Sequence, residues 1–292
     1  MKQAAWKARI KEVFMQAVFF IAACASILAV ILICVFLFAN GLPAIGKIGP
    51  MEFLLGTRWK PGNNIFGILP FILGSIYVTE GAILIGVPIG ILTSIFMAYY
   101  CPKKIYRPLK AATELLAGIP SVVYGFFGMM VLVPLLRQIP HCKGNVMLTA
   151  CILLGIMILP TIIGTTETAL RSVPAMYHEG ALALGATKER SVFTVIVPAA
   201  KSGIITAIVL GTGRAIGEAM AITLVAGSSV NPPFPFNSVR FLTTAIVSEM
   251  GYAADLHRQV LFTIGLVLFV FIMLINVVLT RILKKGIDDD AK

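Results

Sequence analysis

Apolar residues occur in long runs along this chain, and charged residues separate most of these runs. Four runs carry no charge, and each has at least the roughly 20 residues that a helix needs to cross a bilayer. They cover residues 13–39, 115–136, 146–166 and 259–280. Two more apolar regions contain charges: residues 67–100 include Glu80, and residues 203–226 include Arg214 and Glu218. The pattern predicts a polytopic membrane protein built from α-helices.

Lys and Arg residues predict how these helices cross the membrane, because short cytoplasmic loops carry an excess of them. The N-terminal segment and residues 103–110 are both basic, so an even number of spans separates them. The region 67–100 therefore forms one span behind a short apolar segment at the outer surface. Sixteen of the 24 basic residues then lie inside and seven outside, with Arg214 in the membrane.

The predicted architecture is all-α, with six transmembrane helices and both termini in the cytoplasm. The spans are expected at residues 13–39, 71–100, 115–136, 146–166, 203–226 and 259–281. They form one transmembrane domain over residues 13–283, between a cytoplasmic N-terminus (1–12) and a cytoplasmic tail (284–292). A long cytoplasmic loop, residues 167–202, connects the fourth and fifth spans.

Composition supports a lipid environment and excludes other classes of protein. Hydrophobic residues make up 58% of the chain and charged residues 13%, whereas soluble proteins have about 45–50% and about 25%. A disordered chain, a coiled coil and an ordinary soluble enzyme are thereby excluded. The net charge of +11 follows from the membrane topology, so we expect lipid and not nucleic acid as a partner.

The chain lacks the motifs of metal and nucleotide binding. Its five cysteines contain no CxxC pair and its three histidines stand apart, so we expect no metal site and no cofactor. It has no G-x-x-x-x-G-K-[ST] motif, so we expect it not to bind ATP. We therefore predict a transport subunit rather than an enzyme, powered by a separate ATPase or by an ion gradient.

The loop at residues 167–202 is predicted to fold as two short helices. Ser172 precedes Pro174, a sequence typical of a capped helix start. Gly185 is expected to end this helix, and Thr187 to cap a second one that runs to Pro198. Such an element on the cytoplasmic face is either a docking site for another protein or a packed connection, and helical geometry alone leaves both open.

A motif in this loop resembles the EAA loop of the membrane subunits of ABC importers. That pattern reads Glu-Ala-Ala, three residues, Gly, nine residues, and Ile-x-Leu-Pro. Here Gly180 replaces the first Ala, and valines replace Ile and Leu. The resemblance implies that this loop is the coupling helix, which binds a cleft of the ATP-hydrolysing subunit. Its residues are Glu179, Gly180, Ala181, Gly185, Val195, Val197 and Pro198.

Two further stretches, residues 116–125 and 213–221, resemble the phosphate-specific importers, and the PstC-type permeases more closely than the PstA-type ones. The similarity covers nearly the whole chain, although Ala219 replaces the usual Thr. It implies import of inorganic phosphate across the bacterial inner membrane. It also implies three kinds of partner: two copies of an ATP-binding subunit, a second, PstA-type permease, and an extracytoplasmic phosphate-binding protein.

Charges within the predicted spans are candidates for the translocation path. Arg214 lies mid-span, where a charge costs about 2.5–3.5 kcal/mol on insertion scales. Glu218 follows four residues later, so we expect both on one helix face, where Glu218 holds Arg214. The two either neutralise each other or present a guanidinium to a tetrahedral oxyanion. The resemblance favours the second role, and gives Arg171, four residues after Glu167, a role at the exit.

Gly118, Pro120 and Gly125 are expected to break the third span, either beside a water-filled path or as a simple kink. Residue chemistry also leaves the substrate open, because Arg214 suits sulfate, molybdate or tungstate as well as phosphate. A carrier from another class, coupled to ions through Glu218, would leave the EAA-like loop unexplained. Glu80 is expected at the membrane interface rather than at a pore mouth.

Overall fold

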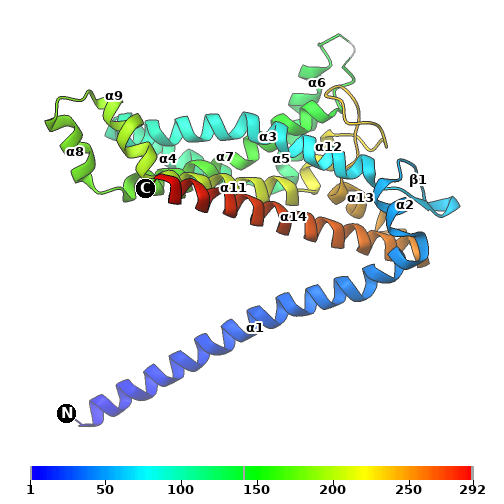
Figure 1. Cartoon of the computed structure of the whole chain (residues 1–292), viewed down its shortest axis with the longest axis horizontal. Coiled ribbons are helices and arrows are strands. Elements are labelled where there is room, and N and C mark those ends of the chain that lie inside the picture. The colour runs from blue at the N-terminus through cyan, green and yellow to red at the C-terminus, as the bar shows by residue number, and fades with distance from the viewer. Residues whose placement is uncertain (1, 141, 291–292) are drawn as a thin grey trace.

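The computed structural model describes the backbone of residues 2–140 and 142–290, and the side chains of residues 11–140, 142–278 and 280–281. Most of this part of the chain is helical (Figure 1). The longer helices are α1 (Lys2–Ile48), α3 (Leu69–Ile95), α4 (Lys103–Gly118), α7 (Met147–Ser172), α11 (Lys201–Gly217) and α14 (Asp255–Asp290). The shorter ones are α2 (Pro50–Leu55), α5 (Ser121–Phe127), α6 (Val133–Leu136), α8 (Ala175–Ala183), α9 (Lys188–Ser191), α10 (Val197–Ala199), α12 (Met220–Val225) and α13 (Leu242–Glu249).

Three π-helical segments extend or join these helices, at Phe96–Tyr100, Gly128–Leu132 and Val192–Ile196. The only strands in the described residues, β1 (Trp59–Lys60) and β2 (Ile65–Phe66), form a small antiparallel hairpin in which Trp59 pairs with Phe66. This hairpin and the α8–α9 region lie at opposite ends of the molecule (Figure 1).

Four single helices are long and apolar enough to cross a membrane: Lys11–Ile48, Leu69–Tyr100, Met147–Ser172 and Asp255–Val278. Two helix pairs also qualify if each pair forms one bent span. The pair Lys103–Gly118 and Ser121–Leu136 bends by 100°, and the pair Lys188–Ala199 and Lys201–Gly217 bends by 69°. The described residues therefore contain four to six spans, and the predicted count of six requires both bent pairs to cross.

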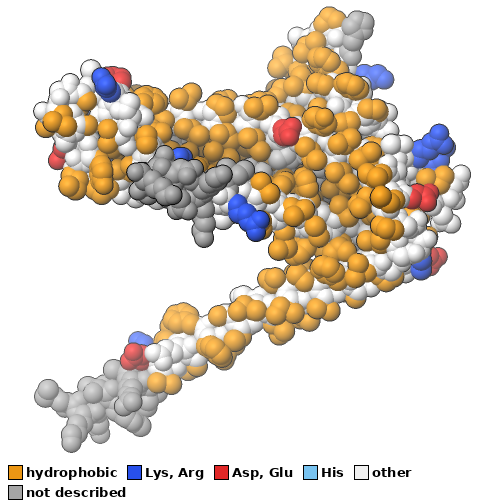
Figure 2. All heavy atoms as spheres, in the orientation of Figure 1, with side chains coloured by type: hydrophobic (Ala, Val, Ile, Leu, Met, Phe, Trp, Pro, Cys, Tyr) orange, Lys and Arg blue, Asp and Glu red, His pale blue; other side chains and the backbone are white. Residues whose placement is uncertain are grey.

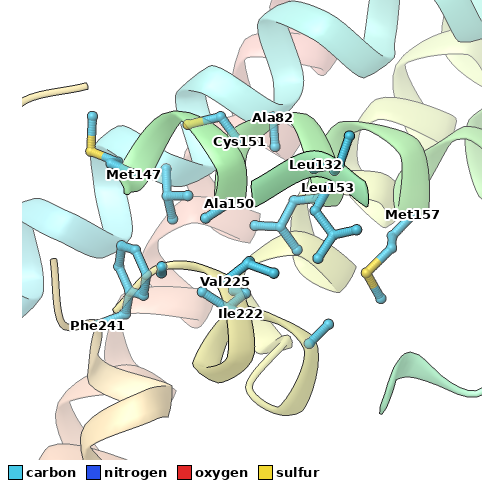
Figure 3. Packing of buried hydrophobic residues seen from close by; sticks show 14 of the residues in the cluster. Ala82, Leu132, Met147, Ala150, Cys151, Leu153, Met157, Ile222, Val225 and Phe241 are labelled. Atoms are coloured by element: carbon cyan, nitrogen blue, oxygen red, sulfur yellow. The ribbon is translucent and has the colours of Figure 1, made fainter. Parts of the chain in front are cut away.

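Close packing of α3 against α7 forms the centre of the bundle. A Cβ atom added to Gly86 would lie 2.7 Å from the Ile158 side chain and 2.8 Å from the carbonyl oxygen of Gly155. Small residues allow two helices to approach this closely in a membrane protein. On the other side of α7, Leu153 faces Ile222 and Val225 of α12 across the main apolar cluster (Figure 3). This cluster fixes where α12 lies.

Helix α1 diverges from the rest of the molecule toward its N-terminus (Figure 1). Near its C-terminal end the Thr263 hydroxyl donates to the carbonyl of Gly41 at 2.7 Å, which joins α1 to α14. No residue in its most apolar stretch is buried, and hydrophobic side chains cover its surface (Figure 2). A helix that is apolar on all sides needs lipid or another protein around it.

A buried carboxylate, Glu249, organises the end of the molecule that carries the hairpin. It accepts a hydrogen bond from Trp59 Nε1 at 3.1 Å and forms an ion pair with Arg240, and its other contact is His257 Nε2 at 2.7 Å. Since Glu249 is only 4% exposed, these partners offset the cost of burying its charge. The cluster holds the hairpin against α13 and α14.

Candidate functional site

Helices α8 and α9 project from one end of the bundle (Figure 1). No residue of α8 is buried, and two of its apolar side chains, Met176 and Tyr177, are more than half exposed. Leu184, at the end of α8, is 91% exposed. Apolar side chains so exposed on a projecting helix are typical of a surface that contacts another protein.

The two glycines of the EAA-like motif have different structural roles. Gly185 adopts φ = +85°, a conformation that strongly favours glycine, and it ends α8 as the sequence predicts. A Cβ atom added to Gly180 would meet nothing within 4 Å. The structure therefore has room for the usual Ala at position 180, and steric crowding does not explain why Gly180 replaces it. Glu179 lies exposed on the same helix, beside the half-buried Ala181.

One expected cap of this region is present and the other is not. The Thr187 side chain accepts a hydrogen bond from the Arg190 backbone N–H at 3.3 Å, as the sequence predicts. The prediction that Ser172 caps α8 is wrong. Its hydroxyl donates to the carbonyl of Ala169 on its own helix, and Pro174 precedes the first turn of α8 instead.

Side chains connect the projection to the bundle. His178 Nδ1 lies 2.8 Å from the Ser191 hydroxyl, which joins α8 to α9. The Tyr99 ring packs against the His178 ring with centroids 5.6 Å apart, and the Tyr99 hydroxyl donates to the carbonyl of Leu170 at 3.0 Å. Pro198 lies in α10, beside the 69° bend that leads into α11. A force on α8 can therefore reach both α7 and α11.

Glu167 forms a buried ion-pair network at this same end of α7. Its side chain is 2% exposed. One carboxylate oxygen accepts from the Tyr106 hydroxyl at 2.6 Å and from Arg171 Nε at 2.9 Å, and the other pairs with Lys110 Nζ at 2.9 Å. Arg171 also donates to the carbonyl of Met97 at 3.0 Å. The expected Glu167–Arg171 pair is confirmed. The other two partners, Lys110 and Tyr106, come from α4, and sequence spacing does not reveal that α4 contacts α7.

The predicted pairing of Arg214 with Glu218 on one helical face is wrong. Helix α11 ends at Gly217, and Glu218 has extended backbone angles, φ = −72° and ψ = 132°. Its carboxylate accepts from the backbone N–H groups of Ala219 and Ala221, at 3.2 and 3.0 Å. Unpaired N–H groups at a helix start attract such an acceptor, so Glu218 stabilises the start of α12 instead of binding Arg214.

Arg214 is exposed, and in the described part of the chain its side chain makes one weak hydrogen bond, from Nη1 to the Thr161 hydroxyl of α7 at 3.4 Å. Within the described residues it forms no ion pair with a carboxylate. A Cβ atom added to either Gly213 or Gly217 would meet nothing within 4 Å. The helix break beside Arg214 therefore borders open space on the surface of the isolated chain.

The expected break of the third span lies between Gly118 and Ser121. Helix α4 ends at Gly118, and Pro120 precedes α5. The Tyr124 hydroxyl donates to the carbonyl of Leu116 at 2.8 Å, which bridges the break. Gly125 lies inside α5, where a Cβ atom would come within 2.7 Å of the Leu224 side chain. Gly125 thus permits α5 to pack on α12, and the third span is no single straight helix over residues 115–136.

Glu80 lies about a third of the way along the stretch Leu69–Tyr100, counted from its N-terminal end. It borders an apolar cavity of about 460 Å³ between α3, α11 and α14, together with Thr212 and Phe271. The interface position expected for Glu80 stays a prediction.

Long apolar helices around two backbone breaks, with a projection at one end, define a polytopic membrane protein. Residues 90–288 match the family described as "Binding-protein-dependent transport system inner membrane component". This match spans most of the chain, and the chain belongs to that family. It is a multi-pass membrane protein and a transport component, not an enzyme, and membership implies an ATPase and a substrate-binding protein as partners.

Several curated proteins resemble the chain over most of their length. It is 41% identical to the probable ABC transporter permease protein YqgH of Bacillus subtilis, over 89% of each chain. It is 33% identical to the probable phosphate transport system permease protein PstC of Methanocaldococcus jannaschii, over 87% of this chain and 88% of that one. The PstC protein of Mesorhizobium japonicum is 35% identical, over 86% and 84%.

Among solved structures, an inward-facing MetNI methionine ABC transporter is similar, with a TM-score of 0.63 and 21% identity. The similarity covers 78% of this chain and 99% of that one. At this identity the likeness establishes the fold alone. The predicted fold class, an all-α type I ABC importer permease, is therefore confirmed.

Proposed function

We propose that the chain is the PstC-type permease subunit of an ATP-driven importer of inorganic phosphate. The observation that carries this proposal is the sustained similarity to relatives named phosphate transport system permease, at 33–35% identity over more than 80% of each chain. Arg214 supplies matching chemistry, since a guanidinium fits a tetrahedral oxyanion and is always charged. It is exposed and has no carboxylate partner among the described residues.

The proposed topology places the α8–α9 projection in the cytoplasm of a bacterium and the hairpin outside the inner membrane. The transmembrane domain comprises residues 13–283, with six spans if both bent helix pairs cross. The coupling segment around Glu179, Ala181 and Gly185 would contact one of two ATPase copies. A PstA-type permease would complete the pore, and a phosphate-binding protein would deliver substrate to the outer face.

In this mechanism the ATPase drives the bundle between two states through α8. Nucleotide shifts that equilibrium only as far as it binds the two states with different affinity. Contacts from His178 and Tyr99 transmit motion of α8 to α7, and the bend at Pro198 transmits it to α11. Helix α11 carries Arg214, so motion of the coupling segment changes which side of the membrane this guanidinium faces.

Glu218 and Arg171 have separate roles in the proposed path. Glu218 fixes the break after α11 through its bonds to the start of α12, which keeps Arg214 free for substrate. Arg171 lies at the inner end of α7 and remains 46% exposed although it contacts Glu167. It would attract phosphate as it leaves toward the cytoplasm. The break at Gly118 and Pro120 would line the same path, whereas Gly125 packs α5 against α12.

ATPase activity of the purified complex, reconstituted with its binding protein, tests the substrate. Phosphate, sulfate and molybdate are compared for the parent complex, for Arg214→Gln, and for the matched control Arg258→Gln at the exposed start of α14. We expect stimulation by phosphate that Arg214→Gln abolishes and Arg258→Gln retains. Selective stimulation by sulfate or molybdate would reassign the substrate, and stimulation that survives Arg214→Gln would remove Arg214 from the path.

A further inference from the structure

A basic cavity of about 690 Å³ lies beside the coupling end of the bundle. Its lining includes four cations: Lys103, Lys104 and Arg107 from the first two turns of α4, and Arg171 from the end of α7. Among the described residues that line it there is no carboxylate. The cavity is distinct from the Arg214 region, because no residue of α11 or α12 lines it.

The cations of α4 are arranged unfavourably for a helix without a ligand. Lys103 and Arg107 are four residues apart, so they repel each other on one helix face. Both lie at the helix N-terminus, where the macrodipole already presents partial positive charge. No acidic residue occurs in this first turn. An anion in the cavity would relieve both repulsions at once.

The opposite wall of the cavity is held rigid. Arg171 is fixed by Glu167 Oε1 at 2.9 Å and by the carbonyl of Met97 at 3.0 Å, and its guanidinium lies 4.8 Å from the centre of the Tyr106 ring. Tyr106 is itself fixed by Glu167. In contrast, the exposed side chains of Lys103, Lys104 and Arg107 form no ion pair within the described part of the chain. Their charges are available to a ligand.

We propose that this cavity is a second anion site, which binds a phosphate group presented either by an anionic lipid headgroup or by free inorganic phosphate. Guanidinium and ammonium groups form charge-assisted hydrogen bonds with phosphate oxygens, and basic pockets on the inner side of membrane proteins bind lipid phosphates. The cavity is larger than a phosphate ion, and the half-buried Ala98 and Tyr99 give it an apolar portion suited to the start of a lipid acyl chain. Only its assignment to the cytoplasmic side rests on the proposed function.

The test uses the detergent-purified complex of all membrane and ATPase subunits, stripped of added lipid. All forms carry Arg214→Gln, so that the Arg214 guanidinium does not contribute to phosphate binding. One arm measures binding of radiolabelled inorganic phosphate by equilibrium dialysis. The other titrates phosphatidylglycerol, with phosphatidylcholine as the zwitterionic comparison, and counts retained lipids by native mass spectrometry. The cavity variant is Lys104→Gln with Arg107→Gln.

The control variant, Lys11→Gln with Arg281→Gln, removes two exposed basic side chains near the two ends of the chain. We expect the cavity variant to lose about tenfold in affinity for one of the two anions and the control to keep it. Loss in the phosphatidylglycerol arm identifies a lipid site, and loss in the phosphate arm identifies a site for free phosphate. Equal binding by both variants in both arms would overturn the proposal, whether or not the complex transports phosphate.

Discussion

Glu167→Gln removes the charge at the centre of the network that joins α4 to α7. Removing one partner of a buried ion pair costs about 3–5 kcal/mol when the other charge stays buried. Here the partners Lys110 and Arg171 are 31% and 46% exposed, so water solvates much of the charge that is set free. We therefore expect a loss of about 1–3 kcal/mol, since exposed pairs contribute much less than buried ones.

Thermal unfolding of the purified complex in detergent measures this loss. The midpoint Tm should fall by roughly 2–12 °C, at the 2–4 °C for each kcal/mol that is typical of domains of about 150–250 residues. Glu12→Gln, which removes an exposed carboxylate near the start of α1, should leave Tm unchanged. A double-mutant cycle with Lys110→Gln isolates the pair. Equal Tm values for Glu167→Gln and Glu12→Gln, with no coupling to Lys110, would refute the reasoning.

Three other substitutions test separate features. Gly185→Ala should lower substrate-stimulated ATPase activity, because φ = +85° costs a non-glycine residue about 1–2 kcal/mol. The control Gly180→Ala should retain activity. Equal activity of the two variants would contradict this expectation. Gly125→Val should lower Tm through its clash with α12, and an unchanged Tm would mean that α5 and α12 are not tightly packed. Glu249→Leu, which leaves Trp59 Nε1–H without this acceptor, should lower Tm and shift the fluorescence of Trp59, and parental spectra would contradict the hydrogen bond.

The apolar runs predict most of the long helices because lipid requires every backbone group to be satisfied within the helix. The run at residues 13–39 lies inside α1, and the run at 259–281 lies inside α14. The run at 146–166 lies inside α7 apart from its first residue. Gly185 and Thr187 are also predictable, because a left-handed C-terminal stop and an N-cap depend on local sequence.

The break after α11 could not be predicted from helical spacing. Arg214 and Glu218 have the spacing of a helical pair, yet the backbone leaves the helix at Glu218, whose carbonyl accepts from the Thr243 hydroxyl at 2.9 Å. That contact comes from a segment 25 residues away. The partners of Glu167 were missed for the same reason, because Lys110 is 57 residues distant and meets it only through packing of α4 on α7.

Uptake of radiolabelled phosphate into proteoliposomes tests the central claim most directly. The vesicles contain this chain with its partner permease and ATPase. The phosphate-binding protein is supplied or withheld at the outer face of the transporter, and ATP at the face that carries the ATPase. The account predicts phosphate accumulation that requires both ATP and the binding protein, and that Arg214→Gln abolishes. Uptake by this chain alone, driven by an ion gradient without ATP, would contradict it.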